Sequence, residues 1–127
     1  WEKAARGVDA RSFPWGDTLD PAFCAMQRSF SGPPRLPTVH EFPADRSVYG
    51  VRGLGGLVRE LCANGYERFG PAGPRVDPRA PAEGPFRMSR GGCIAASAPF
   101  CRAAGRFAGR PEGRLMLVGF RVARSVP

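Results

Sequence analysis

The hydrophobic residues of this chain fall into short groups that glycine and proline separate. Apolar residues at positions 54, 57, 58, 61 and 62 recur at helical spacing, which predicts a short amphipathic helix over residues 54–62. Residues 1–6 are expected to be the end of a helix that Gly7 stops. Both expected helices are short, so most of the chain must take another form.

Four further segments have the apolar pattern of strands. Residues 38–42 alternate, residues 86–89 lead into the Arg-Gly-Gly at 90–92, and residues 101–107 form a third candidate. In residues 115–124 a continuous apolar run is followed by alternation. That pattern predicts a strand buried on one face and covered on both faces where the run is longest. The expected fold class is α+β, with loops prevailing.

The segments between these elements are expected to be turns and loops. "FPWGD" at 13–17 predicts a turn flanked by aromatic residues, in which Trp15 is large enough to anchor the loop in the core. Residues 31–37, "SGPPRLP", cannot form regular structure. Residues 70–85 contain five prolines and predict an exposed loop.

The composition supports a single irregular domain. Hydrophobic residues make up 43% of the 127 positions, which is enough for one core. The 17 glycines and 14 prolines exclude a structure made mostly of long helices or long strands. We therefore expect a loop-rich fold with short elements.

The charge is strongly positive, at +8, but the cations are scattered. No stretch gathers four or five of them, and no basic motif interleaved with aromatic residues is present, so we expect a generally basic surface and no nucleic-acid site. No run of 18 apolar residues and no apolar leader occurs, which predicts no membrane span and a cytoplasmic location.

Residue types alone do not assemble a catalytic site. The cysteines at 24, 62, 93 and 101 are separated by 38, 31 and 8 positions, without the paired spacing of a zinc site. Buried free thiols are the favoured interpretation over disulfides. His40 is the only histidine, and no nucleophile in a recognisable turn accompanies it.

The order of the fragments along the chain is more informative than any one of them. From Trp1 to Arg124 this order resembles that of the formylglycine-generating enzyme, or sulfatase-modifying factor, family. The fragments are "WEKAARG", "FPWGD", "LDPAFC", "EFPADRSVYGVRGLGGLVRELC", "RMSRGG", "CRAAGR" and "VGFRVAR". "FPWGDTLDPAFC" and "VGFRVARSVP" further resemble the domains that follow bacterial serine/threonine kinases.

The resemblance implies an irregular variant of the C-type lectin fold. Family domains are longer, so the chain, as a single domain over residues 1–127, resembles only their C-terminal half and is expected to lack the N-terminal part. In the family the C-terminal strand pairs with a strand near the beginning of the domain. The isolated chain is therefore expected to be incomplete as a folding unit.

The metal sites of the family are matched only in part. Glu60 stands where family members place a calcium ligand, but Leu57 replaces the companion Asn and offers no oxygen. The favoured interpretation is that Glu60 is an exposed helix residue paired with an arginine, and that a calcium remnant is the alternative. Both tryptophans of the family motif are replaced as well, by Arg59 and Leu61.

The oxidase members bind copper through two cysteines that follow the Arg-Gly-Gly. Cys93 and Cys101 follow it here and are the candidate catalytic residues, although neither aligns with the family's pair. A related branch forms sulfur–carbon bonds at iron held by histidines of a separate domain, and His40 cannot replace that set. No cofactor is therefore expected, with calcium or copper as the alternatives.

The motifs that build the fold are retained, whereas those that bind metal are not. The favoured function is a non-catalytic sensory or binding domain for a protein or small-molecule ligand, working with a bacterial serine/threonine kinase. Its candidate contact residues lie between the Arg-Gly-Gly and the Gly-Phe-Arg at 119–121, and Leu115 and Leu117 are expected to belong to the core. These candidates are Ile94, Phe100, Phe107, Leu115, Met116 and Leu117. The alternative is an active oxidase that generates formylglycine in sulfatases, or the iron-dependent enzyme.

Overall fold

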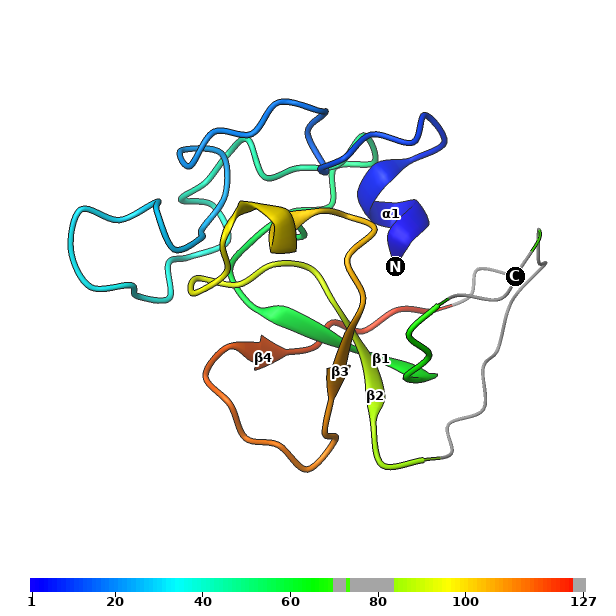
Figure 1. Cartoon of the computed structure of the whole chain (residues 1–127). Coiled ribbons are helices and arrows are strands. Elements are labelled where there is room, and N and C mark those ends of the chain that lie inside the picture. Colours follow the sequence, from blue (N-terminus) through cyan, green and yellow to red (C-terminus); the bar gives the residue numbers. More distant parts are fainter. Residues whose placement is uncertain (70–72, 74–83, 125–127) are drawn as a thin grey trace.

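The regular structure of the chain is a small mixed sheet to which long loops are attached (Figure 1). The computed structural model describes residues 1–69, 73 and 84–124. Its strands are β1 (Arg59–Gly65), β2 (Arg87–Arg90), β3 (Phe107–Gly109) and β4 (Val118–Gly119), in the order β3-β2-β1-β4. β1, β2 and β3 are antiparallel neighbours, and β4 runs parallel to β1.

The helices are as short as the glycine and proline content requires. α1 (Glu2–Arg6) ends where Gly7 adopts a φ of 69°, which confirms the expected stop. Ala5 is the residue of α1 that is buried, and it packs with Leu54 and Ala103. The second helical element is η1 (Ala98–Cys101), a single 3-10 turn with a proline near its start.

The helix expected over residues 54–62 is wrong. Bends occupy its first half, and the second half is the beginning of β1. The reason is a close contact between backbones. A Cβ on Gly56 would lie 2.5 Å from the Ala25 carbonyl oxygen, so residue 56 lies directly against residue 25 and leaves no room for the side chains of a helix there. Leu57 then turns with a φ of 70°, a left-handed conformation that no α-helix contains.

The expected strands are confirmed in one case, confirmed in part in a second and wrong in the other two. Residues 86–89 are confirmed as β2, displaced by one position. Residues 38–42 are turns and bends, and residues 101–107 contain the end of η1 and a turn before β3 begins. Of residues 115–124, Val118 and Gly119 form β4, an edge strand that pairs with β1 at these two residues.

The first expected turn is confirmed. Phe13 and Gly16 exchange two backbone hydrogen bonds, at 2.9 and 3.1 Å. The Phe13 and Trp15 rings stack with their centroids 5.3 Å apart, and Trp15 packs against the main core as expected. Residues 31–37 contain no helix or strand, also as expected. The loop expected over residues 70–85 lies largely outside the described residues.

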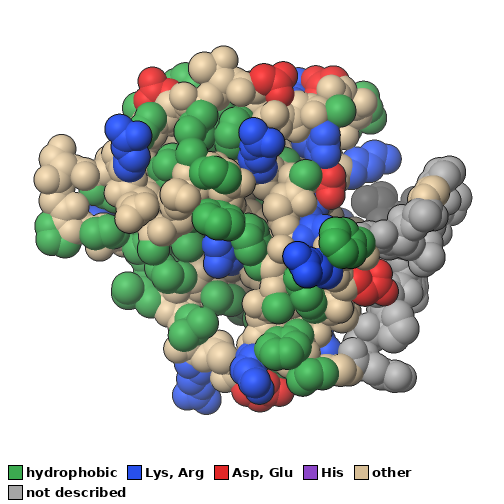
Figure 2. All heavy atoms as spheres, in the orientation of Figure 1, with side chains coloured by type: hydrophobic (Ala, Val, Ile, Leu, Met, Phe, Trp, Pro, Cys, Tyr) green, Lys and Arg blue, Asp and Glu red, His purple; other side chains and the backbone are tan. Residues whose placement is uncertain are grey.

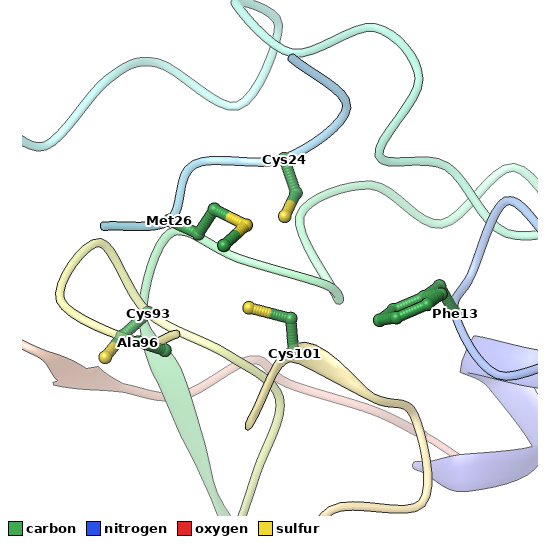
Figure 3. Close-up of a cluster of buried hydrophobic side chains, with 6 residues drawn as sticks. All are labelled: Phe13, Cys24, Met26, Cys93, Ala96 and Cys101. Carbon is green, nitrogen blue, oxygen red and sulfur yellow. The ribbon is translucent and has the colours of Figure 1, made fainter. Parts of the chain in front are cut away.

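The core lies among the loops rather than on a face of the sheet. Its main cluster joins the loops of the first half of the chain, at the top of Figure 1, to the segment that carries η1 (Figure 3). This cluster consists of Phe13, Cys24, Met26, Cys93, Ala96 and Cys101. Within residues 1–69, 73 and 84–124, no helix is long and apolar enough to cross a membrane.

The contact of Gly92 with residue 55 provides a test of this packing. A Cβ on Gly92 would overlap the Gly55 carbonyl oxygen and lie 2.8 Å from the Cys101 sulfur. We expect Gly92→Ala to lower the free energy of unfolding by about 1–3 kcal/mol, because the backbones must move apart. Urea unfolding of both proteins measures this difference.

Gly32→Ala is the matched control, since a Cβ there meets no heavy atom within 4 Å. It should leave the free energy of unfolding unchanged or raise it by about 0.4–1 kcal/mol through the unfolded chain. Equal effects of the two substitutions would contradict the packing described.

Candidate functional site

An open groove lies between α1 and the sheet. Its volume is about 1110 Å³, and β1 and β2 supply its floor through residues such as Leu61, Cys62 and Met88. Glu60, Arg90 and Arg121 form its charged wall together with Trp1 and Glu2. The groove is therefore apolar below and ionic at the side.

Glu60 is the centre of this charged wall. Its carboxylate accepts a hydrogen bond from Trp1 Nε1 at 2.7 Å and a second from Arg121 Nε at 2.7 Å, and Arg121 Nη2 also contacts its other oxygen. Arg121 donates in addition to the Arg52 carbonyl oxygen at 3.0 Å. One carboxylate thus ties the start of the chain, β1 and the segment after β4 together. The expected arginine partner is confirmed, but Glu60 is a buried strand residue, so the expected exposed helix position is wrong.

The same contacts bear on the calcium alternative. Both oxygens of Glu60 are occupied by N–H donors, so a cation would have to displace Trp1 or Arg121 to reach them. Leu57 presents an apolar side chain and no oxygen ligand. Among the residues that the structure describes, no three His, Cys, Asp or Glu side chains gather into a metal-binding group.

Arg90 is the second buried charge of the wall. Its guanidinium pairs with Glu2 and donates to three carbonyl oxygens, those of Ala103 and Ala104 at 3.2 Å and that of Gly105 at 2.7 Å. Burial opposes the ionisation of Glu2, but hydrogen bonds and the charges of Arg6 and Arg90 outweigh it and lower its pKa. The ion pair fixes α1 against the loop that precedes β3.

The two candidate catalytic cysteines share a cluster without forming a pair. Cys93 and Cys101 are both buried, but Figure 3 shows the Cys93 sulfur directed away from Cys101. Cys24, which comes from a distant loop, directs its sulfur toward Cys101. The spacing of the cysteines gave no signal of this juxtaposition, because no local motif links positions so far apart in the sequence.

The candidate contact residues divide into buried and exposed sets. Ile94 is 1% exposed and belongs to the core, and Leu117 packs partly against the main cluster as expected. Leu115 and Met116 are 65% and 69% exposed, so the expected core position of Leu115 and the expected buried strand are wrong. Figure 2 shows hydrophobic side chains on the side of the molecule where β4 and the loop before it lie.

The aromatic candidates lie beside one another. The rings of Phe100 and Phe107 have centroids 6.0 Å apart, and Phe100 is half exposed. The Arg59 guanidinium lies over the Phe107 ring, 3.9 Å from its centroid. Phe120 and Val122, apolar positions of the alternation that predicted a buried strand over residues 115–124, are also exposed.

Asp45 is a further buried carboxylate that the sequence did not single out. Its two oxygens accept the backbone N–H groups of Gly55 and Gly56 at 2.9 and 3.0 Å, so it holds the loop that leads to β1. Burial raises the pKa of Asp45 to about 6, although the hydrogen bonds from residues 54–56 oppose this shift. Its charge faces backbone dipoles and lies away from the groove lining.

Comparison with known proteins gives consistent matches. The family described as the sulfatase-modifying factor enzyme 1-like domain matches residues 1–126. A formylglycine-generating enzyme of Thermomonospora curvata is 30% identical over an alignment of 142 positions, which covers 97% of this chain and 46% of the relative. The serine/threonine-protein kinase pkn1 of Chlamydia caviae is 31% identical over 130 residues, which cover 99% of this chain and 20% of the kinase.

A solved structure agrees with these matches. Treponema denticola variable protein 1 superposes with a TM-score of 0.75 at 27% identity, over 94% of this chain and 43% of that protein. The likeness confirms the expected loop-rich α+β fold of the C-type-lectin-like kind. The chain spans less than half of the length of the relatives and of the solved structure named here.

The hydrogen bonds that the buried Glu60 carboxylate accepts predict that its removal strongly destabilises the folded chain. Glu60→Ala leaves Trp1 Nε1 and Arg121 without their acceptor and should lower the free energy of unfolding by about 2–3 kcal/mol. The matched control is Glu41→Ala, which breaks an exposed pair with Arg35 and should cost less than about 1 kcal/mol. Urea unfolding compares the two, and equal losses would show that Glu60 is not a structural tie.

The raised pKa of the buried Asp45 carboxyl predicts that the stability of the fold depends on pH. Its folded-state pKa, about 6, lies above the ordinary value of 3.8, so between these values the folded chain binds more protons than the unfolded chain. The contribution of Asp45 is therefore most favourable at about pH 4 and is lost as the pH rises through 6, by about 3 kcal/mol.

Asp45→Asn removes this titration and is the variant to compare. The free energy of unfolding of the wild-type chain should fall relative to that of Asp45→Asn as the pH rises from 4 to 7. A difference that stays constant over that range would contradict the raised pKa.

Proposed function

This chain belongs to the family of sulfatase-modifying factor enzyme 1-like domains, and we propose that it is a non-catalytic binding domain within that family. Its partner is a protein in a bacterial serine/threonine kinase system. The observation that carries the proposal is the exposure of large apolar side chains between β2 and the end of the described chain. Phe100, Leu115 and Met116 are 49%, 65% and 69% exposed.

These side chains have the composition of a protein-binding surface. We define the contact surface as Phe100, Phe107, Leu115 and Met116, with Arg59 over the Phe107 ring. Phe, Met and Arg are enriched in protein interfaces, because they supply large contact areas and planar donors. Burying such side chains against a partner removes apolar surface from water, at about 25 cal/mol per Å².

The kinase connection is supported by the relatives. The match to serine/threonine-protein kinase pkn1 covers 99% of this chain, so a domain of this kind occurs within kinase polypeptides. Two such kinases, from Chlamydia caviae and Chlamydia pneumoniae, match over the same share of the chain. A binding domain beside a kinase would bring the kinase to a substrate or respond to a signal.

The alternative function is a metal-dependent oxidase that generates formylglycine. It is favoured by the formylglycine-generating enzymes of Thermomonospora curvata and Streptomyces coelicolor, which are 30% and 32% identical to the chain. The orientation of Cys93 and Cys101 weighs against it, because a soft metal ion such as Cu(I) needs two converging thiolates. The iron-dependent reaction of the related branch has even less support from the residues described.

An activity assay separates the two functions. The chain is incubated with Cu(I), oxygen and a sulfatase-type cysteine peptide, and the aldehyde product is measured by mass spectrometry. We expect no aldehyde above the level without protein, because the two thiols do not converge. Aldehyde formation that is lost in Cys93→Ser or Cys101→Ser would establish the oxidase instead.

Site-specific photocrosslinking tests the contact surface directly. A photoreactive phenylalanine analogue at Leu115 or Met116, in the native gene product in its host, should give a discrete adduct with one protein of the kinase system. Val8 is the matched control, since it is 89% exposed but lies outside the contact surface. The same diffuse pattern of adducts at Leu115, Met116 and Val8 would contradict the proposed surface.

A further inference from the structure

Cys24 and Cys101 are brought together by the fold although they are far apart in the sequence. Each is completely buried, at 0% exposure, and both belong to the main core cluster. Figure 3 shows the Cys24 sulfur directed toward Cys101, whose side chain lies next to it in the same cluster. Both are free thiols in the structure.

The backbone around Cys24 is firmly held. Ser29 Oγ lies 2.6 Å from the carbonyl oxygens of Pro21 and Cys24, which share its one hydroxyl hydrogen, and it accepts the Met26 N–H at 3.0 Å. The Ala25 carbonyl oxygen accepts the Leu57 N–H at 3.0 Å. The Cys24 sulfur is therefore presented from a fixed position.

Backbone hydrogen bonds flank Cys101, from the Phe100 N–H to the Ser97 carbonyl oxygen at 3.0 Å and from the Ala103 N–H to the Ser12 carbonyl oxygen at 2.9 Å. Cys101 ends η1, a single 3-10 turn of four residues, and its sulfur is 3.7 Å from the Ser97 carbonyl oxygen. Its neighbours Phe100 and Arg102 are exposed on either side. Opening of this one turn would expose the Cys101 sulfur to a small oxidant without disturbing the Cys24 loop.

The two thiols also differ in acidity in the way that thiol oxidation requires. A hydrogen bond with Cys24 lowers the pKa of Cys101 against the effect of burial, and the charge of Arg59 favours the same direction. The interaction with Cys101 and burial raise the pKa of Cys24. The first proton therefore leaves Cys101, and the Cys24 S–H stabilises the resulting thiolate.

We propose that Cys24 and Cys101 form a reversible dithiol–disulfide pair that hydroperoxides oxidise. The Cys101 thiolate attacks one oxygen of the hydroperoxide ROOH, the O–O bond breaks, and the alkoxide takes up a proton as ROH. The Cys24 thiol then displaces the hydroxyl of the Cys101 sulfenic acid, which leaves as water. In total, two thiols and ROOH give one disulfide, ROH and H₂O, and a dithiol reductant reverses the change.

The disulfide would link η1 covalently to the Cys24 loop. Phe100, which belongs to the contact surface, immediately precedes Cys101, so oxidation fixes the turn that carries it. The link also closes a long segment of chain, which restricts the unfolded state and stabilises the folded one. The inference concerns the thiols alone and stands without the proposed binding function.

Peptide mapping after oxidation tests the pair. The reduced chain is treated with hydrogen peroxide, unfolded in an alkylating reagent and digested with trypsin without reduction. Cys24 lies in the peptide 12–28, and Cys93 and Cys101 share the peptide 91–102. Cys93→Ser therefore makes the assignment unambiguous, and it is the matched control because Cys93 is buried in the same cluster with its sulfur directed away.

We expect peptides 12–28 and 91–102 of Cys93→Ser to be linked with the loss of two hydrogens. The oxidised protein should melt at a higher temperature than the reduced one, and dithiothreitol should reverse both changes. Cys24→Ser and Cys101→Ser should not form the link. Full alkylation of Cys24 and Cys101 after peroxide treatment, or a link from either to Cys62, would overturn the proposal.

Discussion

Glycine backbones in van der Waals contact with other segments are the constraint on which the described fold depends. Gly56 lies against the backbone of Ala25, and Gly92 lies against Gly55, so that three segments from different parts of the chain meet without side chains between them. Such contacts bury backbone N–H groups that require acceptors. The Asp45 carboxylate supplies two of them, to Gly55 and Gly56.

This constraint explains which elements the sequence could predict. The stop of α1 at Gly7, the aromatic turn at residues 13–17 and β2 are specified by nearby residues, and their patterns predicted them correctly. The apolar spacing of residues 54–62 is equally clear, but the contact with Ala25 overrides it, and the segment forms bends followed by the start of β1. Local pattern fails where a distant backbone decides the conformation.

The candidate site shows the same division. The arginine partner of Glu60 was predicted from its charge, yet its identity as Arg121 and the hydrogen bond from Trp1 depend on three distant segments. The juxtaposition of Cys24 and Cys101 likewise depends on how two loops pack. The family, by contrast, was recognised from the order of fragments, because that order reflects the whole chain rather than any single contact.

The exposed apolar residues are better suited to contacts through side chains than to pairing of strands. β3 and β4 are the edges of the sheet, and they contain only three and two residues. Short edges offer few free backbone groups, which disfavours the addition of a strand from another molecule. Leu115 and Met116 lie on the loop between these strands and present their side chains to solvent. A partner would therefore be recognised by the shape and chemistry of loop side chains, which can change while the glycine-packed scaffold is retained.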